Sequence, residues 1–190
     1  MTELGGHSNQ RHFDVDFVTL ARALDPSKEQ PMAAEIEHKY LVHRNLWTPK
    51  DSGVLYRQGY LSSVKERVVR VRIAGDGAYL TVKGLTTGVT RLEFEYPIPM
   101  ADAAIILDQL CERPLIEKTR YREEYQGHVW EIDEFHADNE GLILAEIEVA
   151  AESERYAIPP WAGAEVSSDP RYFNANLGLN PYKSWKPRDA

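Results

Sequence analysis

The sequence predicts an α+β fold in which eight antiparallel strands close into a barrel, a tunnel with a few flanking helices. Three observations lead to this prediction. Between residues 34 and 149, most segments alternate polar and apolar residues with the period of two that is typical of strands. One stretch in that region, from Ala103 to Leu110, instead has apolar residues at helical spacing. Finally, charged side chains fall repeatedly on one strand face, as expected if that face encloses a common space.

The expected strands follow one another along the chain, and eight of them suffice to close a barrel. We place them at about 34–42, 56–62, 67–74, 78–83, 90–98, 116–125, 128–135 and 142–149. The Asp-Gly pair of AGDGA suits a tight hairpin turn after the third strand, and GLTTG connects the fourth to the fifth. The helix begins after Pro99 and ends before Pro114. One or two helical turns are expected after residue 150, followed by a C-terminal packing element.

The composition is that of a soluble globular protein, because 43% of its 190 residues are apolar and 27% are charged. No apolar run approaches the ~20 residues of a membrane span, and the N-terminal region lacks a signal-peptide pattern. With Cys111 as the single cysteine, we expect no internal disulfide and a cytoplasmic protein. The polar residues 1–31 are expected to form an extension or linker, with a short amphipathic helix allowed between Phe17 and Leu24. Residues 32–190 are expected to form the main domain.

Charged residues occupy alternate positions within seven of the expected strands. The pattern is visible in EIEHK (35–39), RVRI (70–73), TVKG (81–84), RLEFE (91–95), EKTRY (117–121), WEIDE (130–134) and AEIE (145–148). For a single strand, a solvated outer face explains such alternation. The repetition of single-sign faces favours enclosure, because like charges on an open sheet gain nothing from each other.

Two kinds of ligand are consistent with these faces. Clustered carboxylates favour hard divalent cations such as Mg²⁺ or Mn²⁺. Clustered arginine and lysine favour a multiply charged anion, most simply a chain of phosphates. The formal net charge of −8 argues against an open surface for duplex nucleic acid, although an enclosed pocket can still be basic. A hydrated lumen that holds a metal–polyphosphate complex satisfies both sets of charges.

These segments resemble the CYTH superfamily, the triphosphate tunnel metalloenzymes, and especially its short bacterial inorganic triphosphatases. The resemblance rests on EIEHK, QGYLS, RVRI, LTVKG, RLEFEYPI, LIEKTRY, WEIDEF and AEIEV, which occur in this order between Glu35 and about Trp185. It implies an eight-stranded antiparallel tunnel that binds triphosphate with divalent metal ions. It also implies hydrolysis of that substrate.

The resemblance further implies roles for individual residues. The metal-side carboxylates would be Glu35, Glu37, Glu93, Glu95, Asp133, Glu146 and Glu148. The phosphate-binding bases would be Lys39, Arg70, Arg72, Lys83, Arg91, Lys118 and Arg120. Lys39, Lys83, Glu146 and Glu148 are the catalytic candidates, and either a glutamate or Lys39 would assist proton transfer. Arg122 and Glu131 share these strand faces but lie nearer the strand ends, so we leave them out. The implied cofactor is Mg²⁺ or Mn²⁺, as two ions.

The expected function is metal-dependent hydrolysis of inorganic triphosphate to diphosphate and phosphate. One alternative is a hydrolase or cyclase that acts on an organic triphosphate, such as thiamine triphosphate or ATP. Another is a polyphosphate-binding module without turnover. The expected partner is a small polyphosphate, with no nucleic acid and no membrane, and the sequence leaves the oligomeric state open.

Overall fold

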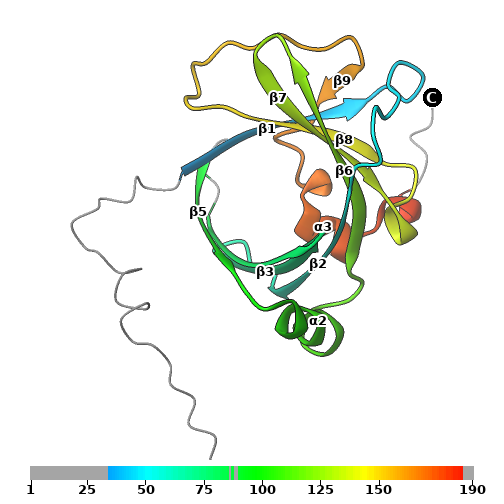
Figure 1. The fold of residues 1–190 in the computed structure, drawn as a ribbon. Coiled ribbons are helices and arrows are strands. Elements are labelled where there is room, and N and C mark those ends of the chain that lie inside the picture. Colours follow the sequence, from blue (N-terminus) through cyan, green and yellow to red (C-terminus); the bar gives the residue numbers. More distant parts are fainter. Residues whose placement is uncertain (1–33, 86, 88–89, 186–190) are drawn as a thin grey trace, which may run out of the picture. The chain divides into compact units, whose positions relative to one another are not determined.

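The computed structural model describes residues 34–185 except residues 86, 88 and 89 (Figure 1). The expected extension 1–31, with its short helix, lies outside the described residues. Each of the eight expected strands is present, with ends that differ by a few residues from their expected positions. Among the described helices, none is both long and apolar enough to cross a membrane.

The described residues form nine strands and two α-helices. The strands are β1 Ala34–Val42, β2 Val54–Ser62, β3 Arg67–Ala74, β4 Gly77–Gly84, β5 Thr90–Pro97, β6 Ile116–Tyr125, β7 His128–Phe135, β8 Ile143–Glu148 and β9 Ala162–Glu165. The helices are α2 Met100–Gln109 and α3 Asn174–Leu179, and the short 3₁₀ turns are η1 Ala137–Asn139, η2 Pro170–Tyr172 and η3 Tyr182–Ser184. The segment after residue 150 forms a turn rather than helix, because it leads into Pro159 and Pro160 and then buries Trp161 in the core.

The predicted closed eight-stranded barrel is wrong. The strands form one open, nine-stranded antiparallel sheet in the order β5-β4-β3-β2-β6-β7-β8-β1-β9. The sheet curls so that β5 returns to the start of β1 (Figure 1), but the two strands share only the register pairs of Ala34–Ile36 with Thr90–Leu92. The rest of β1 pairs with β8 and β9, while β5 from Glu93 onward pairs with β4. The two strands therefore part after a short contact.

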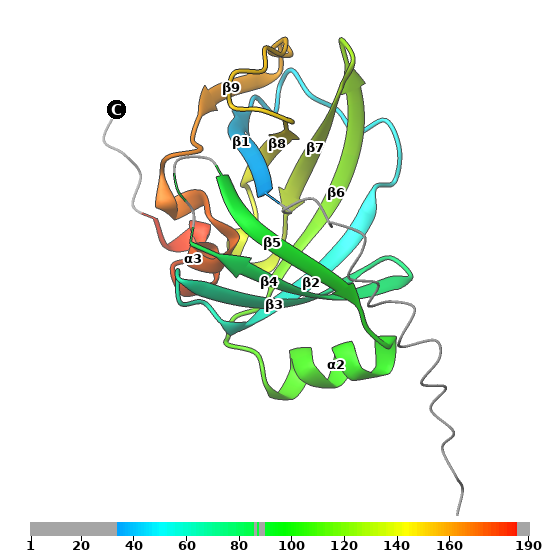
Figure 2. The ribbon, with the colours of Figure 1, turned by 90° about the vertical axis from the view of Figure 1, so that its left-hand side faces the viewer.

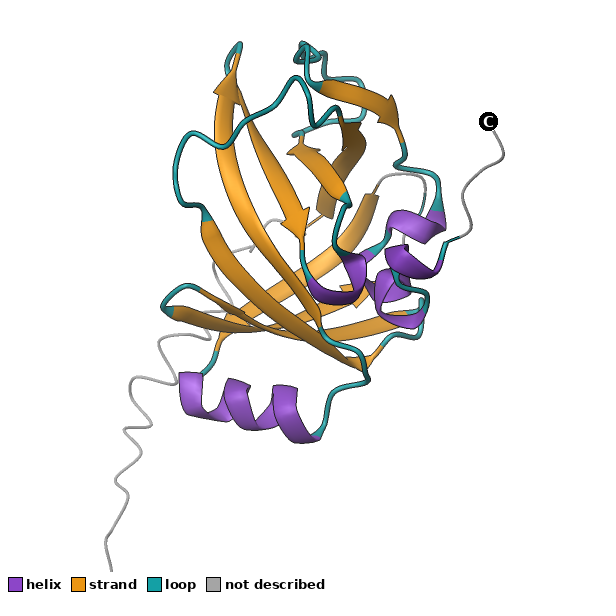
Figure 3. Cartoon of the chain, turned by 90° about the vertical axis from the view of Figure 1, so that its right-hand side faces the viewer, coloured by secondary structure: helices purple, strands orange, loops and turns teal. Residues whose placement is uncertain are grey.

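Two of the three apolar clusters pack on the outer face of the curled sheet, which leaves most of the inner face to the charges. Val71 on β3 is fully buried and packs with Leu107 of α2, which lies outside β3 (Figure 2). Trp130 on β7 is likewise fully buried, and its ring contacts Tyr40 and Trp161. The segregation of these two clusters from the charges is what the alternating sequence predicts. A third cluster lies instead on the inner face at one end of the strands, where Tyr60, Phe135 and Leu144 pack against α3 and the 3₁₀ turns (Figure 3).

Candidate active site

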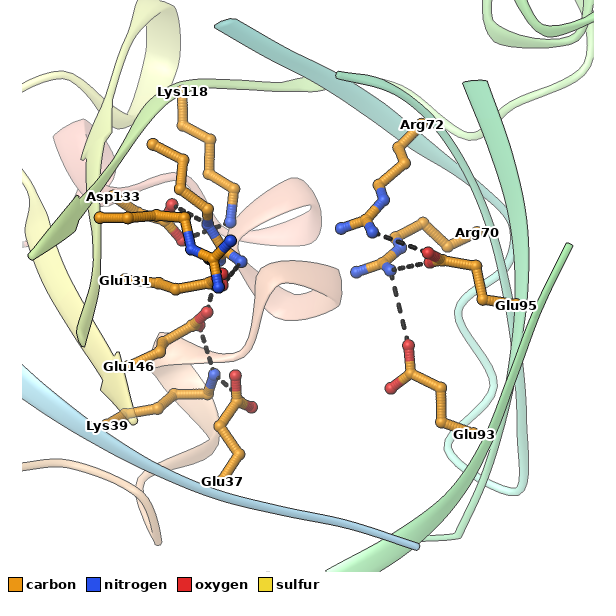
Figure 4. Close-up of polar contacts among 12 residues, drawn as sticks. Glu37, Lys39, Arg70, Arg72, Glu93, Glu95, Lys118, Glu131, Asp133 and Glu146 are labelled. Carbon is orange, nitrogen blue, oxygen red and sulfur yellow. Dashed lines mark hydrogen bonds and ion pairs between the residues drawn. The ribbon is translucent and has the colours of Figure 1, made fainter. Parts of the chain in front are cut away.

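The inner face of the sheet surrounds a cavity of about 720 Å³. Among the described residues, eight lysines and arginines and six glutamates line it. The strand period places them there: Val71 points outward into the core, so its neighbours Arg70 and Arg72 point inward. In Figure 4 the labelled side chains form two groups that face each other across the cavity.

The first group, the Glu146 cluster, is joined by hydrogen bonds and comprises Glu37, Lys39, Lys118, Arg120, Glu131, Asp133 and Glu146. Lys39 Nζ donates to Glu37 Oε2 at 2.7 Å and to Glu146 Oε1 at 2.5 Å, and Arg120 Nη2 donates to Glu146 Oε2 at 2.5 Å. Although burial opposes the shift, Lys39 and Arg120 hold the pKa of Glu146 well below its usual range. Against the same opposing effect of burial, Glu146 and Glu37 raise the pKa of Lys39. Both groups are therefore ionised at neutral pH.

Asp133 belongs to this cluster but lies behind the bases rather than on the cavity wall. It is fully buried, and it is not among the cavity-lining residues. Its Oδ1 accepts from Arg120 Nε at 2.7 Å, and its Oδ2 accepts from Arg120 Nη2 at 2.6 Å and from Lys118 Nζ. Burial first, and then the neighbouring Arg120, lower the pKa of Lys118 to about 8. Asp133 thus partly offsets the repulsion between two buried cations.

The second group, the Glu95 cluster, comprises Arg70, Arg72, Thr81, Lys83, Glu93 and Glu95. Arg72 Nη2 donates to Glu95 Oε1 at 2.9 Å, and Thr81 Oγ1 donates to Glu95 Oε2 at 2.8 Å. Arg70 Nη2 lies 3.4 Å from Glu95 Oε2, and Lys83 Nζ lies 2.6 Å from Glu93 Oε2. The side chains belong to β3, β4 and β5, so each ion pair or hydrogen bond joins two different strands of the sheet.

Arg91 connects the two groups where β1 and β5 meet. Its Nη2 lies 3.7 Å from Glu37 Oε2 on β1 and 3.8 Å from Glu93 Oε2 on β5. The short backbone contact between these strands is thus supplemented by an ion pair on each side. The site as a whole is a cavity with acids and bases interleaved on opposing walls.

Comparison with known proteins places this arrangement in a family. The model of the CYTH domain matches residues 33–176. The chain belongs to the CYTH domain family. It is 51% identical over 155 residues to an inorganic triphosphatase of Acetivibrio thermocellus. The aligned residues make up 82% of this chain and 99% of that protein.

Two further comparisons agree with this assignment. An inorganic triphosphatase of Nitrosomonas europaea is 33% identical over 150 residues, which is 77% of this chain and 97% of that protein. The crystal structure of the inorganic triphosphatase NE1496 is 32% identical and has a TM-score of 0.56, over 76% of this chain and 94% of that chain. The matches cover nearly the full length of these relatives, so the likeness extends over the whole CYTH domain.

The CYTH domain brings most of the sequence-predicted residues to the cavity. The lining includes Glu37, Lys39, Arg70, Arg72, Lys83, Arg91, Glu93, Glu95, Lys118, Arg120, Glu146 and Glu148. Glu148 stands opposite Glu37 in the β1–β8 register. The backbone of Glu35 pairs with that of Arg91, but the Glu35 side chain lies outside what the structure describes. Asp133 is brought to the bases but not to the cavity wall.

Sequence reasoning missed other residues on the cavity wall. Glu131 lines the cavity and accepts from Arg120 Nη1, whereas Arg122, which was left out with it, is exposed. Alternation along WEIDEF does place Glu131 on the inner face, and only its position nearer the strand end excluded it from the predicted site. Tyr56 and Tyr60 of β2 also line the cavity, and the QGYLS motif marked the second of them. Lys65 and the residues around α3 also line the cavity. The sequence pattern does not reveal them, because they lie in loops and short turns where side chains have no strand period.

The donor chemistry of the site fits a hard divalent cation. Among the described residues, no group of three aspartate, glutamate, histidine or cysteine side chains converges as a ready-made metal site. Mg²⁺, however, is commonly held by one or two carboxylates together with substrate phosphates. Glu37, Glu146 and Glu148 lie on the neighbouring strands β1 and β8, all on the cavity wall. Their oxygens suit an ion whose remaining ligands come from a phosphate and from water.

Proposed function

We propose that this protein hydrolyses inorganic triphosphate to diphosphate and phosphate with a divalent metal ion. The observation that carries the proposal is the enclosed wall of interleaved bases and glutamates around about 720 Å³. A small, highly charged anion needs many cationic donors, which this wall supplies. The 51% identity to a protein named inorganic triphosphatase supports the same substrate.

The bases are distributed to grip a linear anion from both sides. Arg70, Arg72 and Lys83 approach from β3 and β4, whereas Lys118 and Arg120 approach from β6. Guanidinium groups bind phosphate oxygens with paired N–H donors, and these fixed charges stabilise negative charge on the group being transferred. Lys39 and Lys83 are proposed catalytic residues on this basis. Lys39 is proposed to act as a cation toward phosphate, because Glu37 and Glu146 hold its ammonium group at the cavity wall.

The proposed metal-side residues are Glu37, Glu146 and Glu148, with Glu93 and Glu95 on the opposite wall. When bound, Mg²⁺ or Mn²⁺ supplies Lewis acidity that offsets phosphate charge and makes water easier to deprotonate. Two ions, one for each wall, match the separation of these carboxylates into two groups. Asp133 is proposed to hold Lys118 and Arg120 in place, since both its oxygens already accept from them.

A substrate panel tests the proposal. With Mg²⁺ or Mn²⁺, we expect phosphate and diphosphate in equal amounts from inorganic triphosphate, and slower turnover of ATP and thiamine triphosphate. A chelator should stop the release, and added metal should restore it. If an organic triphosphate is turned over as fast or faster, it and not inorganic triphosphate would be the substrate. Tight binding of triphosphate with no phosphate released would instead indicate a binding module.

A further inference from the structure

Strand β2 separates the two rows of bases without adding a charge of its own to the cavity wall. It pairs with β3, which carries Arg70 and Arg72, and with β6, which carries Lys118 and Arg120. Within the described residues, β2 contributes Tyr56 and Tyr60 to the cavity lining. Its one arginine, Arg57, instead pairs with Asp108 at the C-terminal end of α2. The inner face of β2 is thus uncharged between two cationic strands, with Gln58 buried between the two tyrosines and donating to Tyr60.

Tyr56 lies at the centre of this arrangement. It stands opposite Lys118 in the β2–β6 register, and its ring is half-buried. The ring centroid lies 5.5 Å from Arg72 Cζ, 5.3 Å from Arg120 Cζ and 5.9 Å from Lys118 Nζ. Each of these distances is within the range of about 6 Å over which an aromatic face attracts a cation. One neutral side chain therefore contacts three cations from two strands.

The ring provides something that a carboxylate in its place would not. A carboxylate would neutralise the bases and repel an incoming phosphate, whereas the ring attracts the cations without a net charge. The edges of both guanidinium groups are held by carboxylates, since Arg72 donates to Glu95 and Arg120 donates to Asp133, Glu131 and Glu146. The ring adds a neutral contact on the guanidinium face, which remains when a phosphate takes the place of a carboxylate. The ordering of long side chains, which would otherwise oppose binding, is then completed before the anion arrives.

We propose that Tyr56 is a positioning residue that orients Arg72, Lys118 and Arg120 toward the cavity for a phosphate chain. The inference rests on the proposed function for its substrate, but its contacts come from the geometry alone. It predicts that the affinity for triphosphate depends on the electron-rich ring of Tyr56 and not on its hydroxyl group.

Substitutions at Tyr56 separate these contributions. Tyr56→Phe keeps the ring, so its KM for triphosphate is expected to stay within about two-fold of the original, because phenylalanine also attracts cations. Tyr56→Leu removes the ring, and we expect KM to rise about ten-fold with kcat changed less, since three cation contacts are lost. Tyr79→Leu is the matched control, because among the described cations only Arg72 lies over the Tyr79 ring, at 5.3 Å. Its effect on KM should be clearly smaller.

A series that preserves side-chain shape keeps the test decisive even if Tyr56→Leu folds poorly. Phenylalanine with one, two and then five ring fluorines at position 56 weakens the negative ring face in steps at nearly constant size. We expect the triphosphate dissociation constant, measured by calorimetry, to rise with each step. A flat series, or Tyr56→Phe as impaired as Tyr56→Leu, would overturn the proposal. If the unmodified protein binds triphosphate but does not hydrolyse it, the proposed function fails while this binding series still decides the role of Tyr56.

Discussion

Replacement of Glu146 by glutamine is expected to reduce phosphate release from triphosphate by more than about 100-fold, since partners one shell further from a metal already cost 10–100-fold. Glu146 is 6% exposed and accepts from both Lys39 and Arg120. Glutamine keeps the shape but removes the charge, and its amide group opposes the N–H donors of the two bases. The variant loses a proposed metal ligand and the anchor of two phosphate-binding cations at once. Initial rates across a metal titration measure the loss.

Glu131→Gln is the matched control for Glu146→Gln. Glu131 also accepts from Arg120, but its side chain is 31% exposed against 7% for Glu146. We expect its activity loss to stay below about 10-fold, the lower end of the effect of residues beside a metal ligand. A folded Glu146→Gln variant with unchanged metal-dependent turnover would remove Glu146 from the metal assignment. Equal losses of activity in both variants would show that each carboxylate supports the reaction only through its ion pair with Arg120.

Replacement of Asp133 by asparagine is expected to lower the free energy of unfolding by about 3–5 kcal/mol, as when one partner of a buried ion pair is removed. Asp133 is fully buried, and Lys118 is 2% exposed, so water cannot replace the lost charge. The remaining Lys118 and Arg120 would then repel each other with less compensation. Urea-induced unfolding followed by circular dichroism measures the change.

The control for Asp133→Asn is Asp169→Asn. Asp169 pairs with Arg171 through Oδ2 at 2.5 Å, but the Arg171 side chain is 42% exposed. Exposed ion pairs contribute about 0–1 kcal/mol, so this variant should unfold almost as the original protein does. If Asp133→Asn were equally mild, Asp133 would not be compensating the buried cations. Its proposed positioning role would then be wrong.

Alternation was sufficient to predict the eight strands and the direction of most of their side chains. It succeeds because the outer face packs against elements such as α2, so that Val71 must be apolar where Arg70 and Arg72 need not be. It could not predict β9, since AGAE is too short and too small in side chains to show a period. Nor could it predict the open sheet, because closure depends on how far β5 and β1 stay in register.

The candidate site was predictable as a set of residues but not as a set of contacts. The strand faces identified Glu146 and Lys39 as neighbours of the same space, while their direct hydrogen bond depends on the β1–β8 register. The depth of Asp133 likewise follows from its position opposite Arg120 in the β6–β7 register. Glu131 lies nearer a strand end and yet reaches the cavity, because Arg120 on the neighbouring strand donates to it. Such details come from pairing between strands, which a single strand's pattern does not contain.

The mutual neutralisation of the cavity side chains has a thermodynamic consequence. Lys39 forms ion pairs with Glu37 and Glu146, and Arg72 forms one with Glu95. A phosphate that captures these cations frees carboxylates for a divalent ion, and an ion that captures the carboxylates frees the cations for phosphate. Each ligand should therefore tighten the binding of the other by the same factor, as linkage requires. The protein would therefore bind phosphate and a divalent ion cooperatively, each weakly alone and both tightly together.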